Sequence, residues 1–126
     1  MKRLLLASAF FCWLSSPVNA DSETQNCQDP QTQTDMNICA NEAFRRADTT
    51  LNQLYQQIKN KYAPTQFQQF QKVQINWLKF RDSQCAFEAV FYQGGTIVPL
   101  IHANCMESLT QERNQHFKRL LKGPPY

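Results

Sequence analysis

Several sequence motifs that indicate metal binding or catalysis are missing from this 126-residue chain. It has no close Cys-x-x-Cys pair of the kind that holds structural zinc, and it has no Gly-x-Ser-x-Gly nucleophile elbow. Its two histidines, His102 and His116, are fourteen residues apart on one predicted helix. That spacing puts them roughly 21 Å apart, too far to share one metal ion. We therefore predict no metal site, no cofactor and no catalytic residues, and the protein is not expected to be an enzyme.

Long apolar runs are also missing, apart from one near the N-terminus. The run at residues 4–14 has about eleven residues, whereas roughly twenty are needed to cross a bilayer. It follows a short basic start and precedes small residues that end at Ala20, which is the pattern of a cleaved signal peptide. We predict that residues 1–20 are the signal peptide. Residues 21–126 then form one periplasmic or secreted domain with no membrane span.

No block of basic residues remains after this cleavage. The whole chain has 13 basic and 10 acidic residues, and the loss of Lys2 and Arg3 leaves 11 against 10, a net charge of about +1. Nucleic-acid binding draws most of its affinity from neutralising phosphates. The mature sequence therefore gives no indication of a nucleic-acid partner.

A helical repeat of apolar residues dominates the rest of the chain. Between residues 34 and 62 apolar side chains recur at steps of three and four, which predicts an amphipathic helix with Thr32 or Thr34 as N-cap. Pro64 interrupts this pattern, and the capping-box sequence at residues 65–68 predicts the start of a second helix. Two long helices joined by so short a turn must run antiparallel.

A third helix completes the predicted fold. Gly94 and Gly95 end the second helix or the short irregular stretch after it, and residues 96–99 can start the third. The sequence at residues 123–125 is a strong stop. No stretch alternates convincingly as a strand. We predict an all-α fold, in which an antiparallel helical hairpin and a third helix are stapled by two disulfides.

The mature chain keeps four cysteines: Cys27, Cys39, Cys85 and Cys105. An even number in an exported chain implies two disulfides. Cys39 lies 23 residues before the turn at position 62 and Cys85 lies 23 residues after it, so an antiparallel hairpin puts them at the same height. We therefore favour Cys39 with Cys85 and Cys27 with Cys105. The sequential pairing is the main alternative, and the sequence leaves the choice open.

The connection before the third helix is the predicted contact with a partner. It is the longest irregular stretch, and loops on rigid scaffolds often carry function. The residues that we expect to contact a protein partner are Phe91, Tyr92, Gly94, Gly95, Thr96 and Ile97. The alternative is a turn that needs positive φ angles and packs its own aromatic rings against the end of the bundle.

Six polar residues lie beside the predicted core stripes: Asn37, Asp48, Asn52, Arg81, Asp82 and Arg113. Paired across helices, they could satisfy one another, and a buried network of that kind can fix helix register. We interpret them as a structural polar network. The Arg81-Asp82 charges could take part through an ion pair with Arg113, or they could serve as a helix cap.

The motifs of this chain resemble those of a known family. They are Cys27, Thr34-x-Met36-Asn37-x-Cys39-Ala40, Ala47-Asp48-x-x-Leu51-Asn52-x-x-Tyr55, Gln74-x-x-Trp77-x-x-Phe80-Arg81-Asp82-x-x-Cys85, Gly94-Gly95-Thr96, Cys105 and Thr110-x-x-Arg113. Over nearly all of the mature chain, the sequence resembles the LprI-type lysozyme inhibitor domain of exported bacterial envelope proteins. The resemblance implies a helical, disulfide-bonded, exported domain that inhibits a lysozyme by blocking its cleft.

The leading hypothesis is therefore a periplasmic binding or inhibitor protein whose partner is a lysozyme. The alternative is a structural or adaptor module of the cell envelope without inhibitory activity. Lysozymes of the common animal type are strongly basic, so an acidic face on the inhibitor would add speed and affinity. A net charge of about +1 predicts little steering of this kind.

Overall fold

A computed structural model of the chain describes residues 26–124, which form three long α-helices. They are α1 (Gln33–Lys61), α2 (Pro64–Val90) and α3 (Val98–Lys122), and the described residues contain no β-strand. The predicted all-α fold with two disulfides is confirmed. The predicted signal peptide at residues 1–20 lies outside the described residues.

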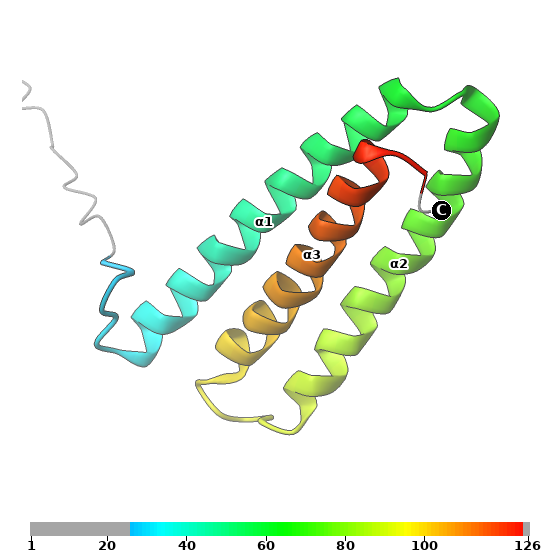
Figure 1. Cartoon of the computed structure of the whole chain (residues 1–126). Helices are drawn as coiled ribbons and strands as arrows, with labels where there is room; N and C mark the ends of the chain where they lie inside the picture. Colours follow the sequence, from blue (N-terminus) through cyan, green and yellow to red (C-terminus); the bar gives the residue numbers. More distant parts are fainter. Residues whose placement is uncertain (1–25, 125–126) are drawn as a thin grey trace, which may run out of the picture.

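The third helix is the central element of the bundle. Figure 1 shows α3 between α1 and α2, so that it separates the two arms of the hairpin. The Asn37 side chain donates to the Thr96 carbonyl at 2.9 Å, and the Tyr62 hydroxyl donates to the Leu120 carbonyl at 2.8 Å. These two hydrogen bonds lie at opposite ends of the bundle and show that α1 and α3 are parallel. The α3 backbone runs close to α1 and somewhat less close to α2, whereas the backbones of α1 and α2 stand farther apart and meet through long side chains.

The central position of α3 also decides the disulfide pairing. Cys85 on α2 is bonded to Cys105 on α3, and Cys39 on α1 is bonded to Cys27 on the N-terminal arm. The favoured pairings, Cys39 with Cys85 and Cys27 with Cys105, are both wrong, because α3 lies between the two arms of the hairpin and places its own cysteine beside Cys85. The sequential alternative is the pairing observed.

The helix starts follow the rules of N-terminal capping, with one shift. The Thr32 hydroxyl accepts a hydrogen bond from the Asp35 amide at 3.1 Å, and the Asp35 carboxylate accepts one from the Thr32 amide at 3.2 Å. The second helix begins at Pro64, before the predicted capping box, and the Gln66 side chain accepts from the Ala63 amide at 3.2 Å. A proline at the first helical position has a suitable φ and needs no amide partner, so the helix starts there.

Two apolar clusters fill the interior, one toward each end of the bundle. The cluster near the α1–α2 turn contains the fully buried Ile58 and Phe117, and the cluster at the other end surrounds the disulfide between α2 and α3. A layer of buried polar side chains lies between them, and we call it the polar band. Its members are Gln74, Arg81, Thr110, Arg113 and Asn114.

Candidate functional site

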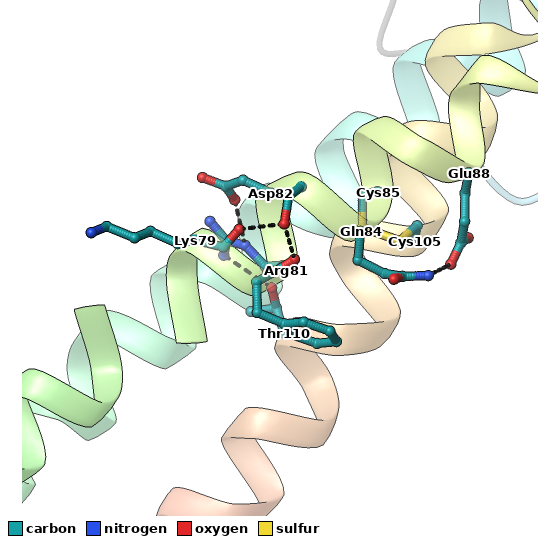
Figure 2. The surroundings of a disulfide bond; sticks show 10 residues. Lys79, Arg81, Asp82, Gln84, Cys85, Glu88, Cys105 and Thr110 are labelled. Carbon is teal, nitrogen blue, oxygen red and sulfur yellow. Dashed lines mark hydrogen bonds and ion pairs between the residues drawn. A yellow bond between two sulfur atoms is a disulfide. The ribbon is translucent and has the colours of Figure 1, made fainter. Parts of the chain in front are cut away.

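Arg81 is the centre of the polar band. Its side chain is 8% exposed, and its Nη1 donates to Asp48 Oδ1 at 3.0 Å and to Thr110 Oγ1 at 3.2 Å. Its Nε donates to Asp82 Oδ1 at 3.0 Å. Figure 2 shows this cluster beside the disulfide that joins α2 to α3. One guanidinium group therefore links all three helices, and its partners offset the free-energy cost of burying its charge.

Arg113 is the second buried arginine, and its polar partners are uncharged side chains. Its Nε donates to Gln74 Oε1 at 3.0 Å, and its Nη1 lies 3.1 Å from His116 Nδ1. Its Nη2 is buried and has no partner among the described residues. Burial lowers the pKa of Arg113. The pKa of His116 is lowered by burial and, to a smaller extent, by the charges of Arg113 and Arg119.

Aromatic rings connect the two arginines. The Cζ atom of Arg81 lies 5.3 Å from the ring centroids of Phe44 and Trp77. The Cζ atom of Arg113 lies 5.4 Å from the Trp77 centroid and 5.0 Å from that of Phe117. Each such contact contributes about 0.5–2 kcal/mol, depending on how far the cation is removed from water. The rings thus join the polar band to the apolar clusters on either side of it.

Four members of the predicted polar network come together in the structure. Arg81 bonds both Asp48 and Asp82, and Asn52 Nδ2 donates to Asp48 Oδ2 at 3.3 Å. Asp48 is partly buried and Asp82 is exposed, with side chains 36% and 61% exposed. The network is therefore buried at Arg81 and reaches solvent through its two carboxylates.

The other two predicted members lie elsewhere. Arg113 makes no ion pair with Asp82 within the described residues, because the Asp82 carboxylate bonds Arg81 and the guanidinium of Arg113 faces Gln74. Asn37 lies at the far end of α1, where its bond to the Thr96 carbonyl ties α1 to the α2–α3 connection. The expected ion pair with Arg113 is wrong.

Three buried polar residues were not among the predicted members of the polar network: Gln74, Thr110 and Asn114. The Asn114 amide donates to a backbone carbonyl of α1 at 2.9 Å, so it joins α3 directly to α1. The signal was available in the helical spacing, because Gln74 falls between Phe70 and Trp77 on the core-facing stripe of α2. A polar residue on such a stripe indicates an internal hydrogen bond.

A groove lies between α1 and α2 beside the polar band. It has a volume of ≈ 350 Å³, and we call it the α1–α2 groove. Ile75 is one of its lining residues and is 48% exposed. The full lining comprises Asp48, Leu51, Asn52, Tyr55, Gln71, Gln74, Ile75, Leu78 and Arg81.

The predicted partner contact at the α2–α3 connection carries exposed aromatic rings. Phe91 is 72% exposed and Phe87 is 58% exposed, and their centroids lie 5.1 Å apart in an edge-to-face arrangement. Tyr92 is 46% exposed. A shallow hollow of ≈ 470 Å³ lies beside Phe91 and Tyr92 and is also lined by Glu88. Large apolar side chains that are exposed and grouped together are typical of interaction sites.

Two glycines give the connection its shape. Gly94 has φ +85°, a backbone conformation that other residues rarely adopt. A Cβ at Gly95 would lie 3.2 Å from the Tyr92 carbonyl oxygen, so the turn also has little room there. Thr96 is exposed and Ile97 is partly buried. We define the loop-end surface as the predicted contact residues together with Phe87 and Glu88; that it binds a partner stays a prediction.

The charges of the chain are separated along the bundle. Residues 26–44 and 82–109 contain no lysine or arginine, and the fold brings these two segments to the end of the bundle that carries the loop-end surface. Their acidic residues are Asp29, Asp35, Glu42, Asp82, Glu88 and Glu107. All the lysines and arginines of the described residues lie in 45–81 and 110–124. The small net charge therefore conceals an acidic half and a basic half.

Metal-binding clusters, membrane-spanning helices and free cysteines are absent from residues 26–124. Within them, no three His, Cys, Asp or Glu side chains are grouped so that they could hold a metal ion. No helix among them is long and apolar enough to span a membrane. Their four cysteines are all bonded in disulfides.

Comparison with known proteins places the chain in a family. An uncharacterized protein of Rhizobium meliloti (strain 1021) is 27% identical over 122 residues, which covers 86% of this chain and 88% of that protein. No solved structure matches the chain. The sequence model of the family described as lysozyme inhibitor LprI matches residues 24–116, which include both disulfides, the polar band and the loop-end surface. The chain therefore belongs to the lysozyme inhibitor LprI family.

Proposed function

We propose that the mature protein is an exported inhibitor of a lysozyme that acts in the periplasm or after secretion. Membership of the lysozyme inhibitor LprI family supports this function. The two disulfides support the location, because such bonds persist in oxidising compartments. The signal-peptide pattern of residues 1–20 provides the route of export, and residues 21–126 then act as a single domain.

The loop-end surface is the proposed contact with the enzyme. The observation that carries this proposal is the position of the exposed rings of Phe87, Phe91 and Tyr92 in the acidic half of the molecule. The carboxylates of this half attract a basic lysozyme that comes within about one Debye length, roughly 8 Å at physiological salt. Such steering raises the association rate, and buried aromatic anchors then supply most of the affinity.

Inhibition of this kind requires no reaction in the inhibitor, only a rigid surface that covers the substrate cleft. The loop-end surface is held in place by links among all three helices. The disulfide between Cys85 and Cys105 fixes α2 to α3, and the bond from Asn37 to the Thr96 carbonyl fixes α1 to the connection. A surface that is already ordered loses little conformational entropy on binding, so more of the contact energy appears as affinity.

The direct test is the activity of several lysozymes on cell-wall substrate in the presence of the purified, oxidised protein. We expect Phe91→Ala to weaken inhibition at least about tenfold, because aromatic hot spots contribute about 2 kcal/mol or more. Phe80→Ala is the matched control. Phe80 is 51% exposed on α2, the helix that Phe91 directly follows, but it lies outside the loop-end surface, so its loss should leave inhibition unchanged.

The charge part of the proposal has its own readout. Glu88→Lys places a cation on the loop-end surface, so we expect slower association with a basic lysozyme and a weaker dependence of the rate on salt. No inhibition of any tested lysozyme at micromolar excess would contradict the proposed function. Equal losses in Phe91→Ala and Phe80→Ala would reject the loop-end surface as the contact.

A further inference from the structure

We propose that the α1–α2 groove is a binding site for a short, uncharged saccharide. The groove lies where the backbones of α1 and α2 stand apart, because α3 packs between them, and long side chains such as Arg81 reach across from one helix to the other. Its volume of ≈ 350 Å³ lies at the lower end of the range of about 300–1,000 Å³ that is typical of small-molecule sites. That space suits a ligand of one or two sugar rings.

The charges that line the groove are matched within the protein. Arg81 Nη1 donates to Asp48 Oδ1 at 3.0 Å, and Asn52 donates to the other carboxylate oxygen at 3.3 Å. A charged ligand attracted to one member of this pair would lie close to the other, like-charged member and would have to displace an ion pair that is already formed. An uncharged ligand avoids this repulsion and leaves the ion pair intact.

The remaining lining groups match a polyhydroxylated ligand. The side-chain amides of Asn52 and Gln71 each offer a donor and an acceptor, as a sugar hydroxyl does, and Gln74, whose Oε1 accepts from Arg113, keeps its NH₂ group as a donor. The exposed Ile75 provides an apolar wall for the C–H face of a sugar or for the methyl group of an acetamido substituent. Tyr55 adds an aromatic ring, held in place by Phe67 with centroids 5.3 Å apart.

Two of these amides have no part in the core. Asn52 is exposed and its side chain bonds only Asp48, although it belongs to the motif by which the sequence resembles its family. Gln71 is also exposed, and its side chain has no partner among the described residues. Both side chains are therefore free to turn toward a ligand in the groove without loss of packing.

The test is an NMR titration of the mature, oxidised protein with N,N′-diacetylchitobiose, an uncharged disaccharide with two acetamido groups. We expect saturable shifts of the side-chain amide signals of Asn52, Gln71 and Gln74. The double variant Asn52→Ala/Gln71→Ala should bind at least about tenfold more weakly, because each lost hydrogen bond is worth on the order of threefold to tenfold in affinity. Its melting temperature should stay that of the wild type.

Gln53→Ala/Gln68→Ala is the matched control, since it removes one exposed amide from each helix outside the groove and should bind normally. The proposal is overturned if about 10 mM disaccharide, tenfold above the Kd of a millimolar complex, gives no saturable shift. It is also overturned if both double variants bind alike, or if the deacetylated, cationic disaccharide binds more tightly. Lysozyme inhibition by Asn52→Ala/Gln71→Ala should be unchanged, so the two proposals can fail separately.

Discussion

Replacing Arg81 with methionine tests whether the polar band holds the three helices together. The guanidinium bonds Asp48 on α1 and Thr110 on α3, so the substitution breaks both links at once. Thr110 is fully buried, and leaving its hydroxyl without this donor costs about 1–3 kcal/mol. The contacts with the Phe44 and Trp77 rings add about 0.5–1 kcal/mol each. Since methionine refills part of the volume, we expect the free energy of unfolding to fall by about 3 kcal/mol.

Denaturant unfolding of the oxidised protein, followed by helical circular dichroism, measures this loss. A double-mutant cycle with Thr110→Val isolates the link to α3, because the valine variant should lose about 1 kcal/mol in the wild type and almost nothing beside Arg81→Met. Lys79→Met is the control for removing a cation from an exposed position of α2, and its effect should stay within about 0.5 kcal/mol. A loss below about 1 kcal/mol for Arg81→Met, or additive effects in the cycle, would refute the reasoning.

His116 makes stability depend on pH. Its pKa is lowered in the folded state, so the unfolded chain binds more protons and stability must fall as the pH drops below about 6.5. His116→Gln should flatten that part of the curve of denaturation midpoint against pH, and an unchanged slope would exclude this cause. Removing the buried disulfide with Cys85→Ala/Cys105→Ala should lower the free energy of unfolding by on the order of 3 kcal/mol in urea titrations. Cys27→Ala/Cys39→Ala should cost less, because it frees an arm that lies outside the helices, and equal losses would contradict that view.

The helices could be predicted because their signals are local. Apolar spacing marks each helix, and Thr32 caps α1 through groups only three residues apart in the chain. The position of α3 is a property of helix surfaces in three dimensions. Buried Ala40 and Ala47 make one face of α1 small, and Asn114 reaches the Ala47 carbonyl directly. This close approach puts α3 next to α1, in the position where the predicted antiparallel hairpin would have put α2.

The sequence predicted which residues belong to the polar network better than it predicted which of them bond one another. Asp48 with Asn52 and Arg81 with Asp82 are neighbours along one helix, so their contacts follow from sequence spacing. The partner of Arg113 depends on how α2 and α3 rotate against each other, and that rotation presents Gln74 in place of a carboxylate. Helix rotation is set by the packing of many side chains and leaves no local mark in the sequence.

The net charge was the most misleading sequence feature, because it does not show where on the surface the charged residues lie. A partner at the surface responds to charges within about one Debye length, roughly 8 Å, so the local distribution decides steering. The absence of lysine and arginine from residues 26–44 and 82–109 is visible in the sequence, but its meaning requires the fold. Only when α1 begins beside the α2–α3 connection do the two segments form one acidic end, and there the exposed rings of Phe87 and Phe91 lie. The same net charge spread evenly over the surface would attract a basic enzyme to no particular face.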